Sequence, residues 1–79
     1  MISVEQIKAA RAMLSWSATE LAARAGVGSA TLKRYERQTG IPVASTRVLN
    51  QLKVVLEQHG IEFTGDPARN PGVTLRIKS

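Results

Sequence analysis

The segment "AARAGVGSATLKRYE", residues Ala22 to Glu36, has small residues at its start and cationic side chains near its end. Gly26 stands where a helix can end in the left-handed conformation without a steric penalty on Cβ. Ala22 and Ala25 are small enough to let two helices cross steeply at such a turn. The segment therefore predicts two short helices, about 18–25 and 29–38, joined by a tight turn.

Helical spacing divides the second of these helices into two faces. Leu32, Tyr35 and Glu36 share one face, where Leu32 can close a core with Leu21 of the preceding helix. This phase favours core packing for Tyr35 over stacking on a base. The other face carries small residues first and long cations after them, which suits a helix that enters the DNA major groove by its N-terminal end. That face holds Ser29, Ala30, Lys33 and Arg34.

Signals outside this segment predict two further helices. Ser3 with Gln6, and Ser17 with Glu20, fit the capping box of a helix start. The first box predicts a helix that runs to about Leu14, and the second begins the 18–25 helix. Ser45 can cap a fourth helix, residues 46–59, whose apolar stripe ends at Gly60.

The last part of the chain changes its hydrophobic period from helical to alternating. The stretches "IEFT" and "VTLRI" flank the turn-rich "GDPARNPG", and this pattern predicts a β-hairpin. The expected fold is mainly α, with four helices over residues 1–60 and a C-terminal β-hairpin over residues 61–79 that belongs to the same domain. An edge strand has unpaired backbone groups, and the apolar side of this one, Val73, Leu75 and Ile77, is the expected dimerisation element. The apolar stripe of the fourth helix is the alternative.

Charge and size favour a small domain with a polyanionic partner. The chain has 79 residues, of which 43% are hydrophobic, and carries 11 Lys and Arg against 6 Asp and Glu, for a formal charge of +5. Residues 24–53 hold six of these cations with Glu36 as the only acid. For Arg24, Arg47 and Lys53, a solvated surface explains the charge about as well as a nucleic-acid contact does.

Several function classes have little support in the composition. One histidine, one aspartate, no cysteine and no glycine-rich phosphate loop argue against an enzyme, a metal site or a cofactor. No apolar run is long enough to span a membrane, and we expect a cytoplasmic protein. A domain this small is marginal alone, so association is the expected reinforcement.

The stretch "WSATELAARAGVGSATLKRYERQTGIP", Trp16 to Pro42, resembles the phage repressor and Cro-like helix-turn-helix regulators, the XRE family. The resemblance extends over the first and fourth helices and covers roughly three quarters of the chain. It implies that residues 1–60 form a phage-repressor-like DNA-binding domain. Ala18 stands where many members carry glutamine, which leaves Arg34 or DNA shape as the expected source of specificity.

The resemblance also implies roles for particular residues. A buried ion pair is expected between Arg11 of the first helix and Glu36 of the third. Phosphates are expected to meet Ser17, Arg37 and the start of the fourth helix, where Arg47 lies. Base edges are expected to face Gly28, Ser29, Ala30, Lys33 and Arg34.

These observations predict a sequence-specific regulator of transcription. The expected form is a repressor or autoregulator that binds double-stranded DNA as a homodimer on a pseudo-palindromic operator. The alternative is a protein-interaction module, such as an antitoxin-like protein, in which the same scaffold binds a regulatory protein and DNA only weakly. A gel shift on the promoter next to the protein's own coding region separates the two.

Overall fold

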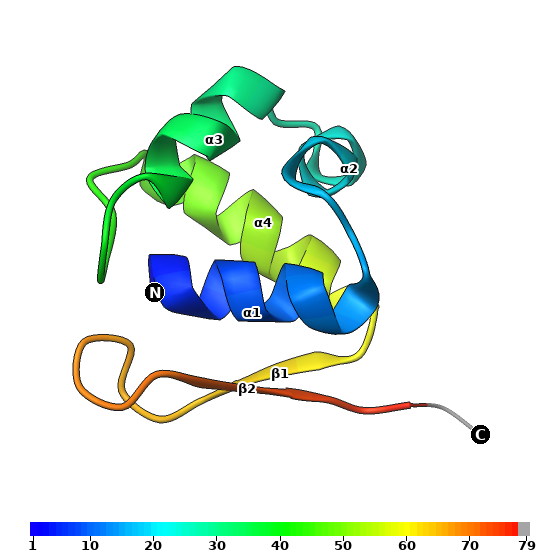
Figure 1. Cartoon of the computed structure of the whole chain (residues 1–79), viewed down its shortest axis with the longest axis vertical. Coiled ribbons are helices and arrows are strands. Elements are labelled where there is room, and N and C mark those ends of the chain that lie inside the picture. Colours follow the sequence, from blue (N-terminus) through cyan, green and yellow to red (C-terminus); the bar gives the residue numbers. More distant parts are fainter. Residues whose placement is uncertain (78–79) are drawn as a thin grey trace.

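The computed structural model describes residues 1–77 and contains four helices followed by two strands (Figure 1). Lys78 and Ser79, the end of the predicted hairpin region, lie outside the described residues. The elements are α1 Val4–Leu14, α2 Ala18–Ala25, α3 Ser29–Glu36, α4 Thr46–Gln58, β1 Ile61–Thr64 and β2 Gly72–Leu75. The predicted class, mainly α with a C-terminal hairpin, is confirmed.

The predicted helix starts at Ser3 and Ser17 are both present. Ser3 Oγ accepts from the Gln6 N–H at 3.1 Å and Gln6 Oε1 accepts from the Ser3 N–H at 2.9 Å, so this capping box is complete. Ser17 Oγ accepts from the Glu20 N–H at 3.0 Å. The Glu20 carboxylate does not reach back, because it accepts from Arg24 Nε at 3.0 Å instead.

Two helix ends differ from the prediction by one or two residues. Helix α3 ends at Glu36 because its last turn tightens: the N–H groups of Arg37 and Gln38 bond carbonyls three residues back. Helix α4 ends at Gln58, one residue before the predicted end. Gly26 ends α2 in the left-handed conformation, at φ 70°, as predicted.

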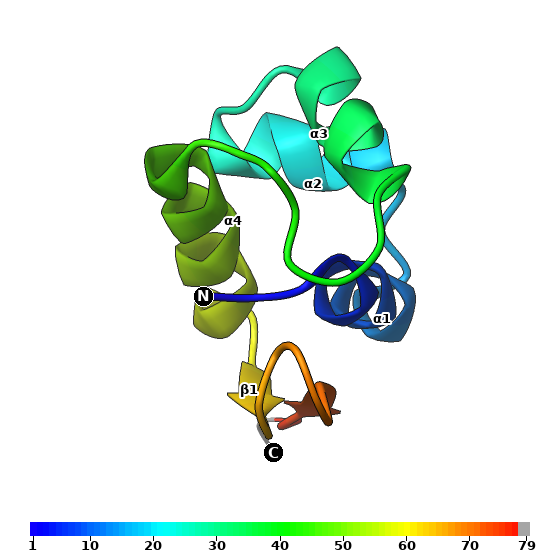
Figure 2. The same ribbon diagram turned by 90° about the vertical axis from the view of Figure 1, so that its left-hand side faces the viewer.

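One apolar core joins all six elements. The steep crossing of α2 and α3 buries Ala22 and Ala25, and their small side chains leave room for Leu32. Figure 2 shows α1 and α4 between this pair of helices and the hairpin. The buried cluster contains Ile2, Ile7, Ala10, Leu21, Ala22, Ala25, Leu32, Leu49, Leu52, Leu56 and Ile61.

The hairpin lies beneath the helices with its apolar side toward them (Figures 1 and 2). Strands β1 and β2 are antiparallel, with Ile61 opposite Leu75 and Phe63 opposite Val73. Phe63, Val73 and Leu75 are partly buried against the helical core. The side chain of Gln6 fastens the loop end of the hairpin to α1, because its Nε2 donates to the carbonyl oxygens of Thr64 and Gly72, at 3.3 and 3.0 Å.

Candidate nucleic-acid interface

Helix α3 presents one polar face to solvent. Gly28 is its N-cap, with φ −63°. Because glycine has no side chain, no bulky group stands at the start of the first turn. Ala30, Lys33 and Arg34 are exposed, and Ser29 is half-buried. The opposite face, Leu32, Tyr35 and Glu36, is buried. The structure therefore brings the five residues predicted to read bases onto the exposed side and first turn of one helix.

The cations of α3 and α4 form no ion pairs within the part of the chain that the structure describes. Within residues 1–77, the ion pairs join Arg11 to Glu36, Arg24 to Glu20 and Arg76 to Glu62. No ion pair in this part of the chain involves Lys33, Arg34, Arg37 or Arg47, all of which are exposed. Such a surface attracts a polyanion, because its positive charge is not neutralised locally.

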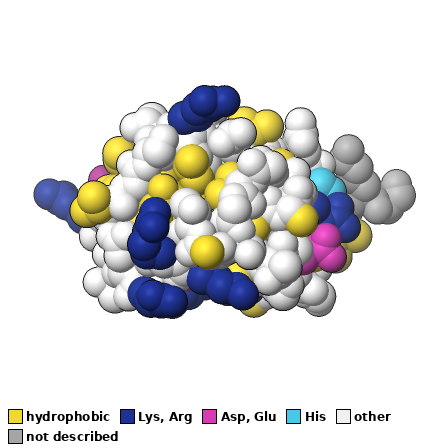
Figure 3. Space-filling model, turned by 90° about the horizontal axis from the view of Figure 1, so that it is seen from above, with side chains coloured by type: hydrophobic (Ala, Val, Ile, Leu, Met, Phe, Trp, Pro, Cys, Tyr) yellow, Lys and Arg dark blue, Asp and Glu magenta, His cyan; other side chains and the backbone are white. Residues whose placement is uncertain are grey.

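Figure 3 views the molecule from the side of α2 and α3. Lysine and arginine side chains are spread over this face, and the acidic side chains in view lie near its two ends. Arg47 lies at the start of α4, and the loop from α3 leads directly to it. We call the surface formed by Ser17, α3, Arg37 and Arg47 the basic face.

Ser17 contributes a helix N-terminus to the basic face. Its Oγ accepts the Glu20 N–H, but the hydroxyl hydrogen remains available to donate. The first backbone N–H groups of α2 lie beside it, and a helix N-terminus favours negative charge. Ser17 is exposed, so a phosphate can reach both groups.

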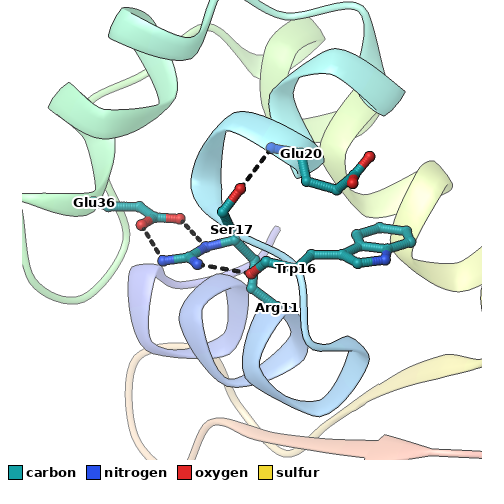
Figure 4. A network of polar contacts seen from close by, with 5 residues as sticks. All are labelled: Arg11, Trp16, Ser17, Glu20 and Glu36. Atoms are coloured by element: carbon teal, nitrogen blue, oxygen red, sulfur yellow. Dashed lines mark hydrogen bonds and ion pairs between the residues drawn. The ribbon is translucent and has the colours of Figure 1, made fainter.

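Arg11 and Glu36 form a bidentate ion pair on the buried side of α3 (Figure 4). Arg11 Nε donates to Glu36 Oε2 at 2.8 Å, and Arg11 NH2 donates to Oε1 at 2.7 Å. Arg11 NH1 also donates to the Trp16 carbonyl oxygen at 3.0 Å. One guanidinium thus ties α1 to the end of α3 and to the residue that precedes the Ser17 cap.

The loop between α3 and α4 is held at three points. Glu5 accepts the Gly40 N–H with both carboxylate oxygens, at 3.0 and 3.2 Å. The Gln38 side chain accepts from the Val43 N–H at 2.8 Å and donates to the Val43 carbonyl at 3.3 Å. The Val4 N–H donates to the Gly40 carbonyl at 2.8 Å. The start of α4, which carries Arg47, is therefore fixed relative to α3.

Hydrogen bonds to backbone N–H groups shift the titration of Glu5. The N–H of Glu5 itself and then that of Gly40 hold the pKa of this carboxyl below its ordinary value. Sequence reasoning missed both loop anchors, Glu5 and Gln38. Glu5 and Gly40 are 35 positions apart in the sequence, so no local pattern marks their contact.

Arg24 has partners within its own chain, unlike the cations of α3. Its guanidinium lies 4.4 Å from the centre of the Trp16 ring and pairs with Glu20. His59 meets the same indole edge-on, with ring centres 4.7 Å apart. His59 Nδ1 lies 2.9 Å from the Val55 carbonyl oxygen at the end of α4. The side chains of Trp16, Arg24 and His59 thus form a contact between α2 and the end of α4.

The predicted dimerisation residues lie on the side of the molecule opposite the basic face. Val73 and Leu75 pack against the core of their own chain, whereas Ile77 is 84% exposed just beyond β2. Residues 1–77 contain no group of three or more histidine, aspartate or glutamate side chains that could hold a metal ion. None of the helices described is long and apolar enough to cross a membrane.

The comparison with protein families agrees with this geometry. A family model described as helix-turn-helix matches residues 7–46, just over half of the 79 residues. The matched range contains most of α1, all of α2 and α3 and the first residue of α4, together with the whole of the basic face except Arg47. No curated protein matches the sequence.

Proposed function

Because the chain belongs to the Cro/C1-type helix-turn-helix family of DNA-binding transcriptional regulators, we propose that it is a repressor or autoregulator that binds a pseudo-palindromic operator as a homodimer. The observation that carries the proposal is the basic face. There Lys33, Arg34, Arg37 and Arg47 form no ion pair with any residue of 1–77, and α3 begins with small residues.

Within this proposal, base edges are read from the exposed side of α3. Gly28, Ser29 and Ala30 allow the first turn of α3 to approach the floor of the major groove. The planar fork of Arg34 can donate to both acceptors of a guanine, and Lys33 beside it can reach a base or a phosphate.

Phosphate contacts would come from the edges of the basic face. Arg37 follows the last residue of α3, and Arg47 lies in the first turn of α4. Ser17 adds its hydroxyl and the N-terminus of α2. Such contacts fix the orientation of the protein on the duplex and carry no sequence information.

The homodimer is proposed on the geometry of DNA. One recognition helix reads only a few base pairs, and two-fold pairing places two of them about 34 Å apart on one face of the duplex. The hairpin, through Val73, Leu75 and Ile77, is the proposed contact. The proposal includes control by protein concentration or by a regulatory protein partner.

A titration of labelled promoter DNA tests the proposal. The duplex should come from the region next to the protein's own coding sequence, with a shuffled duplex of equal length as the control. We expect a specific complex that forms at least 1000-fold more tightly on the promoter, within the usual range of about 10³–10⁷. Equal and weak binding to both duplexes would favour the protein-interaction module instead.

A further inference from the structure

The outer edge of β2 is defined by the register of the hairpin. The Arg76 N–H donates to the Gly60 carbonyl at 2.8 Å, and these two residues lie directly opposite one another in the antiparallel register. In such a ladder, every second residue on a strand directs its N–H and C=O away from the partner strand. Val73 and Leu75 therefore direct these groups to the free edge of β2, and continuation of the same alternation past Arg76 gives Ile77 the same direction.

Nothing in the described chain covers this edge. No backbone or side-chain hydrogen bond from residues 1–77 reaches the N–H or C=O of Val73, Leu75 or Ile77 across it. Ile77 continues the apolar side of the strand, and it is 84% exposed. An edge with unpaired backbone groups and an exposed apolar side chain is a template for another strand.

We propose that β2 pairs with β2 of a second copy in one register, with Leu75 opposite Leu75 of the second copy, so that the two hairpins form a four-stranded antiparallel sheet. The inference rests on the proposed homodimer and specifies its contact. In this register Val73 faces Ile77 of the second copy, and Ile77 faces its Val73. Val73, Leu75 and Ile77 of each copy would therefore form backbone hydrogen bonds with the other copy. The exposed Ile77 gains an apolar neighbour on the helix side of the sheet.

The neighbouring registers are less favourable for reasons of charge and chemistry. A two-fold axis at Arg76 would set Arg76 directly opposite its own copy, and like charges at this position destabilise a strand pair. A two-fold axis at Thr74 would set Ile77 opposite Pro71, which has no N–H to donate. With the axis at Leu75, Arg76 faces the neutral Thr74 of the second copy.

The position of the hairpin makes this contact compatible with binding to one duplex. Figures 1 and 2 show the hairpin on the side of the molecule opposite α2 and α3. A two-fold axis perpendicular to a continuous sheet keeps the helices of both copies on the same side of that sheet. Both α3 helices would then face the same way, as a pseudo-palindromic site requires.

Disulfide trapping tests the register, and the natural chain has no cysteine to interfere. Thr74 and Arg76 are exposed, and in the proposed register they face one another between copies as a pair without ladder bonds, where Cβ atoms approach to about 4.5–5.5 Å. We expect an equimolar, co-refolded mixture of the Thr74→Cys and Arg76→Cys chains to form covalent dimers in mild oxidant. Each variant alone should form at least 10-fold less covalent dimer than the mixture does.

The alternatives give different products. Efficient cross-linking of Thr74→Cys alone would place the two-fold axis at Thr74. Efficient cross-linking of Arg76→Cys alone would place it at Arg76. Either result would overturn the proposed register. Asn50→Cys is the control, because Asn50 is exposed on α4, and its cross-linking alone would assign the contact to that helix. No cross-link in any mixture would overturn the strand pairing. Sedimentation and promoter titration of the natural chain report separately whether the proposed dimer and DNA binding hold.

Discussion

Arg34 and Arg37 are both exposed cations, but Arg34 lies within α3 and Arg37 is the residue after its end. Arg34 lies on the exposed face one turn past Ala30, whereas Arg37 follows the end of α3. We expect Arg34→Ala to lose about 1–3 kcal/mol per half-site on the operator and little on random DNA. Arg37→Ala should weaken both complexes alike and reduce the slope of log affinity against log salt by about one.

Titrations of both variants on operator and random duplex at several salt concentrations measure these effects. Arg69→Ala is the matched control, because Arg69 is an exposed cation of the hairpin loop and its loss lowers the net charge by the same amount. An Arg34→Ala protein that loses equal affinity on both duplexes would show that this side chain does not read a base.

The Arg11–Glu36 pair should contribute to stability rather than to DNA contact. The two side chains are 20% and 9% exposed, so removal of one partner leaves a largely desolvated charge. We expect Arg11→Ala or Glu36→Ala to lower the free energy of unfolding by about 3–5 kcal/mol, with Arg11→Ala nearer the lower end because water already reaches its guanidinium. Denaturant unfolding measures the loss, which is large against the usual stability of a small domain.

A double replacement separates the stranded charge from the lost contacts. Arg11→Met with Glu36→Met removes both charges and keeps most of the side-chain volume, so it should cost less than either alanine variant. An Arg11→Ala protein as stable as the natural chain would contradict the assignment of this pair as structural.

At the level of elements, the α3–α4 loop should respond to acid through Glu5. Its folded-state pKa is lowered by backbone N–H groups, so the contact contributes stability above the unfolded-state pKa and loses it as the pH falls through the folded-state pKa. We expect the Gly40 amide resonance to titrate at a pH below the ordinary glutamate range. In Glu5→Gln this titration should vanish; its persistence would mean that another group moves the loop.

The hairpin should depend on Gln6 more than on any exposed glutamine. Gln6 is 3% exposed and its amide donates to two carbonyl oxygens at the loop end of the hairpin. Gln6→Leu should lower the free energy of unfolding by about 1–3 kcal/mol and speed amide exchange in β1 and β2, and, because it also removes the acceptor of the Ser3 N–H, at the start of α1. Gln58→Leu, at an exposed position on α4, is the control. Unchanged exchange in the hairpin would show that apolar packing alone holds it.

Local sequence signals predicted the helix starts and the main turn, because Ser3, Ser17 and Gly26 act within a few residues of the backbone that they cap. Contacts between distant segments were beyond such signals. The bonds from Gln6 to the hairpin join residues 58 and 66 positions apart. Arg24 was left as an open candidate for the same reason, since its contact with His59 spans 35 positions. The faces of α3 were predictable because they follow from helical phase.

For the whole molecule, the proposed dimer implies that stability depends on concentration. Association that occurs only in the folded state stabilises it by mass action. We therefore expect the thermal unfolding midpoint to rise with total chain concentration, as measured by calorimetry from micromolar to millimolar. Ile77→Asp, which places a charge on the exposed part of the proposed contact, should bind the operator less cooperatively, with Ala68→Asp in the exposed hairpin loop as the control of equal charge. A midpoint independent of concentration would indicate a monomer.

The exposed side of α3 takes almost no part in holding the fold together. Ala30, Lys33 and Arg34 are exposed and contribute nothing to the buried cluster, while Arg11, Leu32 and Glu36 fix the helix from behind. Substitutions at such surface positions usually change stability by no more than about 0.5 kcal/mol. Duplicated copies of this gene could therefore diverge in the DNA sites that they recognise without first acquiring compensating mutations in the core. The same separation makes these positions the natural ones to randomise in a library selected for new operators.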